Sequence, residues 1–199
     1  GGFLNILIAA RDSSKLKMMV YAASSSTYGD SPNLPKVEGT EGNPLSPYAV
    51  TKLVNELYAD VFSRVYSFHT IGLRYFNIFG PKQNPNNPYA AVIPIFCKNF
   101  INKQRPTING DGNTSRDFTF IENAVQANIK AMLYSPLSNH EVMNVACGDQ
   151  VSLNELVQLL QFESDMEINA NYAPERIGDV KHSKASINKI TKYLKYYPK

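Results

Sequence analysis

The chain has 199 residues, enough to bury one sizeable core or two smaller ones. Its hydrophobic fraction of 43%, charged fraction of 19% and net charge of +3 are those of an ordinary globular protein and give no sign of a nucleic-acid partner. The sequence shows neither a signal peptide nor an apolar run of membrane-spanning length, so we expect a cytoplasmic protein that does not bind membranes.

The cysteine and histidine residues indicate no disulfide and no metal site. Cys97 and Cys147 are far apart and lack a C-x-x-C spacing, which predicts two reduced thiols. The histidines at positions 69, 140 and 182 are scattered and lack the spacing of metal ligands. We therefore expect the function to depend on other side chains.

The first predicted elements are a helix, a strand and a long loop. Residues 1–12 are apolar nearly all round, which predicts a buried helix, and because no start signal precedes it we expect the natural chain to begin earlier. Residues 17–23 are a near-continuous apolar run, typical of a strand in a parallel sheet, and the serines at 24–26 stand at its carboxyl end. Prolines at 32, 35, 44 and 47 and glycines at 39 and 42 predict an extended loop.

A long helix is predicted after the loop. Ser46 suits the N-cap and Pro47 the first helical position, and apolar residues recur at spacings of three and four for about 20 residues. Tyr48 and Lys52 stand four residues apart, so we expect both on one face, with Cβ atoms roughly 5 to 6 Å apart. A tyrosine is a poor base at neutral pH, and an adjacent cation favours its phenolate. Taken alone, this spacing is also what chance produces on a surface helix.

The remaining elements complete an α/β pattern. A strand at 70–75 gives the order strand, helix, strand that builds a right-handed parallel crossover. Ligands of such sheets bind beyond the carboxyl ends of the strands, where residues 24–26 and 74–77 fall. The later elements expected are a helix over 91–103, a strand at 106–109, a turn at 110–112, a helix over 118–133, a strand at 141–145, a helix from Ser152 through Leu160 opened by a capping box with Glu155, and a helix over 186–194.

Five short motifs follow one another along the chain. They are Ser-Ser-Ser-Thr-Tyr-Gly at 24–29, Tyr-x-x-x-Lys at 48–52, Arg-Tyr-Phe-Asn at 74–77, Asn-Gly-Asp-Gly at 109–112 running into Ser-Arg-Asp-Phe at 115–118, and Arg-Ile-Gly-Asp-Val-Lys-His-Ser at 176–183. In this order they resemble the extended short-chain dehydrogenase/reductase family, in particular its NAD-dependent nucleotide-sugar epimerases and dehydratases. The match looks closest to the UDP-N-acetylglucosamine 4-epimerases.

The resemblance implies an α/β fold with a Rossmann-like doubly wound parallel sheet, its N-terminal part missing, and a smaller α/β substrate-binding domain. Residues 1–80 and 119–147 would form the second half of the NAD-binding domain, and residues 81–118 and 148–199 the nucleotide-sugar-binding domain. The family's Gly-rich turn after the first strand is absent. We therefore expect the chain to lack about the first third of the enzyme and to be inactive without it.

The resemblance also assigns catalytic and cofactor-binding side chains. Ser24 and Tyr48 would share a proton relay, and Lys52 would hold the nicotinamide ribose of NAD while favouring the phenolate. Ala22, Tyr75 and Phe76 would join Tyr48 and Lys52 in binding NAD. Taken alone, residues 24–26 could equally be a strand-end turn that satisfies backbone groups.

The other assignments concern a UDP-sugar substrate. Asn77, Arg116 and Arg176 would bind the diphosphate, since a guanidinium binds phosphate oxygens in a bidentate fork, and Asp179 would bind ribose or orient this clamp. Uridine would be enclosed by Ala91, Val92, Thr107, Ile108, Asn109 and Phe118. The sugar would meet Ser24, Ser25, Ser26, Gln83 and Ser183. The alternatives are surface salt bridges of the arginines, for example between Arg116 and Asp117, core positions for Val92 and Ile108, and a helix cap for Ser183.

These assignments imply a UDP-sugar 4-epimerase that interconverts UDP-GlcNAc and UDP-GalNAc for surface-polysaccharide synthesis. Tyr48 would take the C4 hydroxyl proton while the C4 hydride passes to bound NAD, and the 4-keto sugar would swing round and take the hydride back. A 4,6-dehydratase would need an Asp-Glu pair where Ser25 and Ser26 stand. UDP-glucuronate epimerisation or decarboxylation remains an alternative, as does a chain that is only a dimerisation or binding module. The resemblance implies a homodimer formed through the Tyr48 helix.

Overall fold

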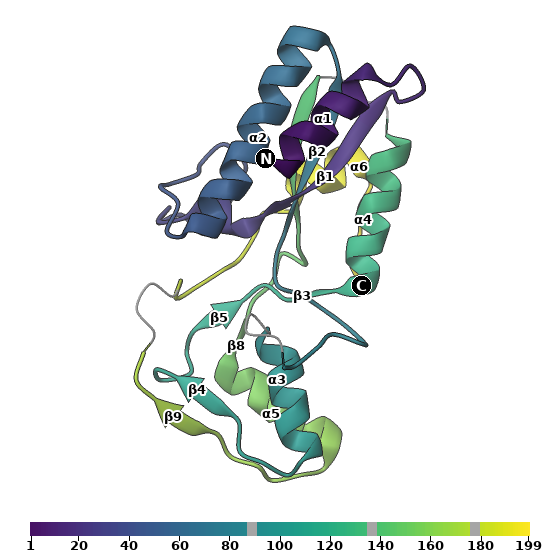
Figure 1. The fold of residues 1–199 in the computed structure, drawn as a ribbon. Helices are drawn as coiled ribbons and strands as arrows, with labels where there is room; N and C mark the ends of the chain where they lie inside the picture. Colours follow the sequence, from purple (N-terminus) through teal and green to yellow (C-terminus); the bar gives the residue numbers. More distant parts are fainter. Residues whose placement is uncertain (87–90, 135–138, 176–179) are drawn as a thin grey trace.

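A computed structural model of the chain describes residues 1–86, 91–134, 139–175 and 180–199 (Figure 1). Its α/β fold contains a parallel sheet of β1 (Met18–Ser24), β2 (His69–Tyr75) and β7 (His140–Val145), in that spatial order. All three strands were predicted to within one residue at each end. The parallel register pairs Ser24 with Tyr75 and Tyr75 with Val145, so the carboxyl ends of the strands meet at one edge of the sheet.

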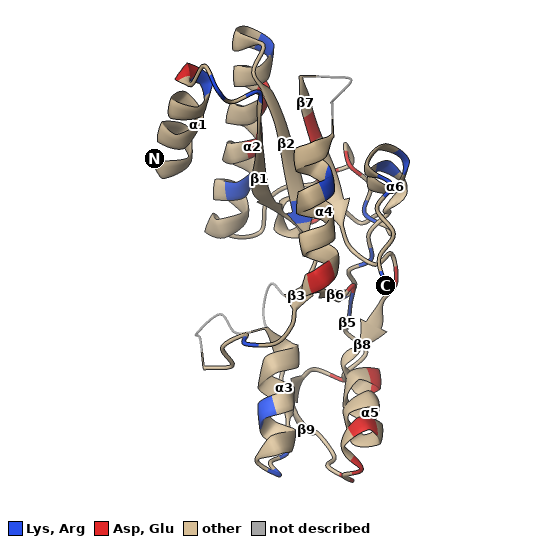
Figure 2. Ribbon diagram, turned by 90° about the vertical axis from the view of Figure 1, so that its right-hand side faces the viewer, with Lys and Arg blue, Asp and Glu red and all other residues tan. Residues whose placement is uncertain are grey.

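Helices cover both faces of this sheet (Figure 2). α1 (Gly2–Asp12) and α2 (Pro47–Tyr66) lie on one side, and α4 (Ile121–Leu133) and α6 (Asn188–Leu194) lie on the other. Strand residues alternate between the two faces. Tyr21 and Ala23 of β1 pack with Ala59 of α2, whereas Ile71 and Leu73 of β2 face α4 and α6. This arrangement confirms the expected doubly wound architecture.

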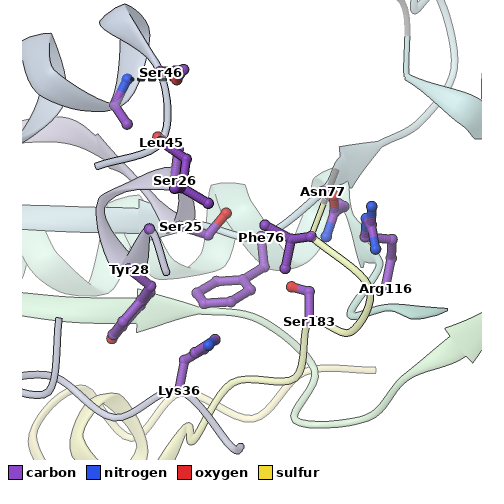
Figure 3. Close-up of a pocket in the computed structure, with 13 residues that line it drawn as sticks. Ser25, Ser26, Tyr28, Lys36, Leu45, Ser46, Phe76, Asn77, Arg116 and Ser183 are labelled. Atoms are coloured by element: carbon purple, nitrogen blue, oxygen red, sulfur yellow. Dashed lines mark hydrogen bonds between the residues drawn. The ribbon is translucent and has the colours of Figure 1, made fainter. Parts of the chain in front are cut away.

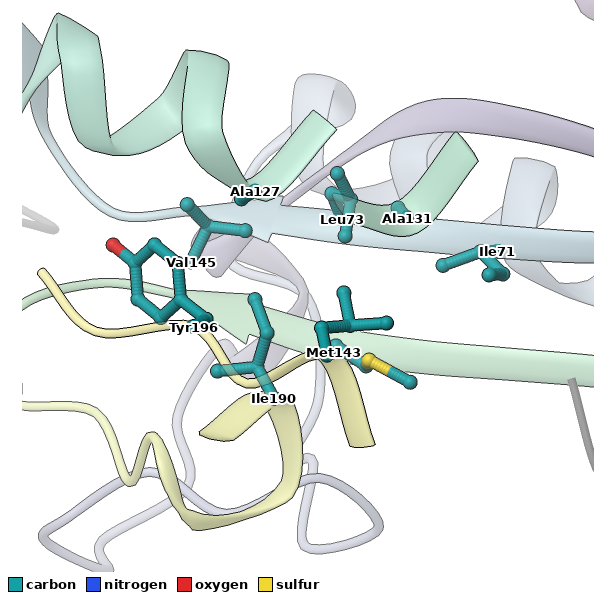
Figure 4. Close-up of a cluster of buried hydrophobic side chains, with 9 residues drawn as sticks. Ile71, Leu73, Ala127, Ala131, Met143, Val145, Ile190 and Tyr196 are labelled. Carbon is teal, nitrogen blue, oxygen red and sulfur yellow. The ribbon is translucent and has the colours of Figure 1, made fainter. Parts of the chain in front are cut away.

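The largest core lies between the sheet and the helices α4 and α6 (Figure 4). Its buried residues are Ile71, Leu73, Ala127, Ala131, Met143, Val145, Ile190, Leu194 and Tyr196. Alanines on the inner face of α4 allow that helix to approach the strands closely. The hydroxyl of the fully buried Tyr196 donates to the carbonyl of Ala146 at 3.0 Å, which satisfies its polar end.

A smaller α/β region lies beyond the carboxyl edge of the sheet, at the bottom of Figure 1. Here α3 (Val92–Ile101) and α5 (Leu153–Ser164) pack around buried Phe96, Phe100 and Leu156. β4 (Thr107–Asn109) pairs in parallel with β9 (Asn171–Ala173), and β5 (Ser115–Arg116) pairs antiparallel with β8 (Val151–Ser152). The predicted capping box opens α5, where Ser152 Oγ accepts from the Glu155 amide at 3.1 Å and Glu155 Oε2 accepts from the Ser152 amide at 2.7 Å.

Three predicted elements were wrong in part. The first helix is not buried all round, since it packs one face against α2 and β1 and leaves Ile6 62% exposed. Residues 118–120 are not helical, because β6 (Thr119–Phe120) pairs with β3 (Ile78–Phe79) and the helix begins only at Ile121. The last helix begins at Asn188 rather than at 186, because the Ser186 amide donates to the carbonyl of Lys36 at 2.9 Å instead. Within the described ranges, no helix has the length and apolar character needed to cross a membrane.

Candidate active site

The start of α2 sets the position of the tyrosine and lysine pair. Ser46 Oγ accepts from the amide of Ala49 at 3.1 Å, and Pro47 occupies the first turn, as the sequence predicts. Tyr48 is therefore the second residue of the helix, with 56% of its surface exposed. A phenol at this place is accessible to a ligand bound beside the helix.

Lys52 links this helix to the end of β1. Its Nζ lies 5.7 Å from the ring centroid of Tyr48 and donates to the carbonyl of Ala22 at 2.8 Å. Ala22 stands two residues before Ser24 on the same strand, so the pair lies beside the serine cluster. A chance Tyr-x-x-x-Lys spacing on a surface helix does not require the lysine to contact a strand end, as Lys52 does through Ala22. One of the three ammonium donors is used by this carbonyl, which leaves two that can hold hydroxyl groups of a ligand.

The serines at the end of β1 form a local turn. Ser24 Oγ, which is buried, accepts from the amide of Ser26 at 3.2 Å and from Ser26 Oγ at 2.9 Å, and the Ser24 carbonyl accepts from Thr27 Oγ1 at 2.8 Å. Ser24 thus caps the short 3-10 helix Ser25–Tyr28, as the turn interpretation expected. Because its oxygen is the acceptor in both side-chain contacts, its own hydrogen can still be donated to another oxygen.

A cavity of about 240 Å³ lies beyond these strand ends (Figure 3), and we call it the sugar cavity. Six of the predicted site residues line it, namely Ser25, Ser26, Phe76, Asn77, Arg116 and Ser183. The sequence did not predict the other lining residues, which are Tyr28, Gly29, Lys36, Leu45, Ser46, Ala49 and Val180. Ser24, Tyr48 and Lys52 are not among its lining residues and lie along the strand and helix that border it.

A second cavity of about 470 Å³ lies in the smaller region, and we call it the base cavity. Its lining includes the predicted uridine-enclosing residues Ala91, Val92, Thr107, Asn109 and Phe118. Asn77 and Arg116 line both cavities. An amide and a guanidinium therefore stand where the two cavities meet.

Asn77 and Arg116 are held in place by backbone contacts. Asn77 has a left-handed φ of 36°, which asparagine tolerates better than most residues, and its side-chain amide donates to the carbonyl of Asp117 at 3.0 Å. Arg116 Nη1 donates to the carbonyls of Ser115 at 3.0 Å and Lys181 at 3.3 Å. Guanidinium and amide donors at one junction form a suitable site for phosphate oxygens.

Asp117, which the sequence suggested as an ion-pair partner of Arg116, has another role. Its fully buried carboxylate accepts from the backbone amides of Cys147 at 2.9 Å, Gly148 at 3.0 Å and Ala185 at 3.1 Å. Burial outweighs these three hydrogen bonds and raises the pKa of Asp117 to about 6. Asp117 thereby ties the end of β7 to the segment that carries Ser183. The sequence marked this position only as part of the Ser-Arg-Asp-Phe motif and as an acid next to Arg116.

Several other predicted site residues lie elsewhere. Ile108 is fully buried in the core of the smaller region, so the core interpretation is correct for its side chain, while its neighbours Thr107 and Asn109 line the base cavity. The side-chain amide of Gln83 donates to the carbonyl of Ile78 at 3.3 Å, and Gln83 lines a different cavity with Phe79 and Cys97. The structure thus does not place Gln83 beside Ser183.

Ser183 and Tyr75 make contacts that the sequence did not predict. Ser183 does not cap the last helix, whose N-cap is Ile187; its amide donates to the carbonyl of Ser115 at 3.1 Å. The hydroxyl of Tyr75 donates to Asn128 Oδ1 at 3.0 Å, so Tyr75 connects β2 to α4. Arg176 and Asp179 lie outside the described residues.

Comparisons with known proteins agree with this architecture. Residues 1–146 match the family described as the NAD dependent epimerase/dehydratase family. A protein of Methanocaldococcus jannaschii, provisionally named a UDP-glucose 4-epimerase, is 34% identical over 90% of this chain and 57% of its own length. The UDP-N-acetylglucosamine 4-epimerase from Methanobrevibacter ruminantium, solved in complex with UDP-N-acetylmuramic acid, is 38% identical, with a TM-score of 0.94 over 99% of this chain and 62% of its own.

A third comparison adds a structure with a bound dinucleotide. The UDP-glucuronic acid 4-epimerase from Bacillus cereus, in complex with UDP-glucuronic acid and NAD, is 29% identical, with a TM-score of 0.87 over 99% of this chain and 61% of its own. The chain thus spans about three fifths of the length of these relatives.

Proposed function

The chain belongs to the NAD-dependent epimerase/dehydratase family, and from this premise we propose that the protein is a UDP-sugar 4-epimerase. The single observation that carries the proposal is the junction of the sugar cavity and the base cavity at Asn77 and Arg116. A nucleotide-sugar has the same order of parts, since its diphosphate lies between the sugar and the nucleoside. The tyrosine and lysine pair borders the sugar side of this junction.

The residues near Tyr48 fit NAD as the cofactor. Lys52 Nζ, fixed by the carbonyl of Ala22, has two further donors suited to the hydroxyls of a ribose, and Tyr48 is accessible beside it. We propose that Lys52, Tyr48 and Phe76 hold the nicotinamide end, with Ala22 and Tyr75 contributing through the strand ends. When bound, NAD would accept a hydride from the sugar and return it, so that the reaction has no net redox change.

In this mechanism the chain's own groups bind the substrate and move a proton. Asn77 and Arg116 would hold the diphosphate, so the sugar is free to turn about that linkage and present either face to Tyr48. The phenolic oxygen of Tyr48 would take the C4 hydroxyl proton, with the ammonium of Lys52 on the same helix face and Ser24 donating a hydrogen bond to the same oxygens. With the hydride returned to the opposite face of C4, Tyr48 would give the proton back to the C4 oxygen, which completes the inversion.

We propose UDP-GlcNAc and UDP-GalNAc as the substrate pair. Ser183 has a small side chain on the wall of the sugar cavity, which leaves room for an acetamido group. The relative from Methanobrevibacter ruminantium, which is named for UDP-N-acetylglucosamine, supports the same choice. A 4,6-dehydratase is disfavoured, because Ser25 and Ser26 line the cavity where an acid pair would be needed to eliminate water.

Three broader proposals go with this function. Two parts of the chain flank the junction. We propose that one, residues 1–80 with 119–147, is the NAD-binding domain, and that the other, residues 81–118 with 148–199, is the nucleotide-sugar-binding domain.

The outer face of α2 carries exposed apolar residues, namely Val50, Val54, Leu57, Val61 and Val65, which supports a homodimer formed through this helix. Nucleotide-sugar chemistry of this kind suits a cytoplasmic enzyme.

The function is tested on the full-length protein, purified without added cofactor. We expect UDP-GlcNAc to be converted to a mixture with UDP-GalNAc, and NAD to be released from the protein on denaturation. Calorimetry with UDP distinguishes the alternative of a pure dimerisation module, which would bind no nucleotide. Absence of interconversion for every UDP-hexose would refute the proposal.

A further inference from the structure

Arg74 is a buried cation near the end of β2, and its guanidinium contacts three separate segments. Its side chain is 4% exposed. Nε and Nη2 donate to the two carboxylate oxygens of Glu56 on α2, at 2.9 and 2.6 Å, and Nη1 donates to Glu41 in the loop that leads to α2. The guanidinium carbon lies 4.8 Å from the ring centroid of Tyr28. One side chain therefore joins a helix, a loop and the turn after β1.

Glu56 continues the helix face that carries the proposed catalytic pair. It stands four residues after Lys52 and eight after Tyr48, and residues four apart follow one another along a helix face. The ammonium of Lys52 donates to the carbonyl of Ala22 on β1. Glu56 is fixed to Arg74 on β2, the neighbouring strand. Two polar contacts one helical turn apart thus attach α2 to two adjacent strands.

The fork between Arg74 and Glu56 fixes an orientation that apolar packing alone leaves free. The other buried side chains of α2 include Ala49 and Ala59, which are small, and apolar contacts are not directional. A guanidinium bound to both oxygens of one carboxylate holds the two groups in a defined geometry. Because a buried ion pair adds little net stability over apolar residues of similar size, its main contribution here is this orientation.

The same guanidinium supports one wall of the sugar cavity. Tyr28 lines that cavity, and its ring lies against Arg74. The hydroxyl of Tyr28 donates to Asn144 Oδ1 at 2.8 Å, and Asn144 pairs with Arg74 in the register of β2 and β7. The Tyr28 ring is therefore held by Arg74 on its face and by Asn144 at its hydroxyl.

We propose that Arg74 is a positioning residue for the epimerase reaction. Through Glu56 it fixes the rotation of α2, and with it the places of Tyr48 and Lys52 beside the sugar cavity. The inference rests on the proposed function and adds to it a residue that is not among those lining either the sugar cavity or the base cavity. A misplacement of about 1 Å can lower the rate of an enzyme about 100-fold, so loss of the fork should be visible in turnover.

The test separates positioning from stability with variants of the full-length protein. The double variant Arg74→Met/Glu56→Met removes both buried charges of the fork together, so neither is left without the other. Glu41, which remains, is 23% exposed in its side chain and can reach water. Arg74→Lys keeps a cation but cannot form the fork. Asp60→Asn, which breaks the exposed pair with Arg64 on the same helix, is the matched control.

Urea unfolding, calorimetry with UDP and the epimerase assay are applied to each variant, with kcat given per mole of folded protein. We expect the double variant to be more stable than Glu56→Gln, and yet its kcat should lie about 10- to 100-fold below that of the wild type. Its affinity for UDP should be nearly unchanged, since the base cavity is formed by other residues. Arg74→Lys should also lower kcat, whereas Asp60→Asn should retain it.

A double variant that has regained stability and turns over at the wild-type rate would overturn the inference, because the pair would then be only a structural support. If the double variant does not fold, Arg74→Lys decides, and wild-type kcat in that variant is the contradicting result. A crystal structure of the folded variant gives a readout that needs no turnover. In it Lys52 Nζ should no longer be bonded to the carbonyl of Ala22, and an unchanged α2 would contradict the inference. Absence of turnover in the wild type with every UDP-hexose refutes the proposed function instead, and the crystal structure then still decides the role of Arg74.

Discussion

Lys52 lies with its Nζ 5.7 Å from the ring centroid of Tyr48, on a helix that begins only one residue before that tyrosine. The same ammonium is fixed to the end of β1 through the carbonyl of Ala22 at 2.8 Å. A phenol, a cation and a serine turn are thus brought together where three strand ends meet. We propose that this phenol is the base that acts on a sugar in the neighbouring cavity, and each prediction below tests one part of that proposal.

Replacing Tyr48 by phenylalanine in the full-length protein should lower kcat by about 10²- to 10⁴-fold, since general base catalysis contributes this much. The affinity for UDP should remain nearly unchanged, because Tyr48 lies outside the base cavity. Calorimetry with UDP and the epimerase assay measure the two effects. The matched control is Tyr58→Phe, at an exposed position of the same helix, which should retain full activity. A fully active Tyr48→Phe variant would remove this residue from the mechanism.

Replacing Arg116 by methionine should weaken UDP binding by about 10- to 100-fold, because one guanidinium contact to phosphate is lost. Arg64→Met is the control, since Arg64 is exposed on α2 and pairs with Asp60. Calorimetry gives the dissociation constant of UDP for each variant, and Arg64→Met should bind UDP as tightly as the wild type. Unchanged UDP affinity in Arg116→Met would show that the diphosphate does not bind at the junction of the cavities.

Asp117 should titrate with a pKa of about 6, well above the usual range of an aspartate. Since its folded-state pKa is raised, the native state holds the proton more tightly than the unfolded state between about pH 4 and 6. This residue therefore adds to the free energy of unfolding as pH falls through that window, and the contribution is lost as pH rises through 6. Carboxyl NMR of labelled protein, compared with Asp117→Asn, measures the titration. A value near 4 would contradict the account of its burial.

Replacing Glu56 by glutamine should destabilise the protein by about 3 kcal/mol, because Arg74 then keeps a buried charge with one carboxylate fewer. Asp60→Asn breaks the exposed pair with Arg64 and should cost at most about 1 kcal/mol. Urea unfolding of both variants gives the two values. Similar small losses would show that the Arg74 network is not a stabilising feature.

The local features of the fold could be predicted from the sequence because their causes are local. Ser46 and Pro47 fix the start of α2 through their own chemistry, and Ser152 with Glu155 fixes that of α5. The strand β1 was found because its apolar run is nearly continuous. Ile6 was misjudged, since periodicity shows that a helix is apolar but not which of its faces has a neighbour.

For the site, the sequence predicted which residues take part, because they belong to motifs or follow strand ends, but not how the cavities that they line are arranged. Asn77 and Arg116 are assigned by their motifs, but the meeting of two cavities between them depends on the packing of distant elements. Gln83 follows a strand end in sequence and yet bonds the carbonyl of Ile78, because the chain turns there away from the sugar cavity. Lys36 gave no signal in a proline-rich loop, since its burial arises from contacts with residues about 150 positions later.

The most direct test of hydride chemistry at Tyr48 uses a UDP-hexose that carries deuterium at C4. The full-length protein is incubated with this substrate in ordinary water without added NAD, and the epimer is examined by NMR and mass spectrometry. We predict that the product keeps its deuterium at C4, because the hydride leaves and returns to the same carbon. Replacement of the C4 deuterium by a solvent proton would contradict the proposed mechanism.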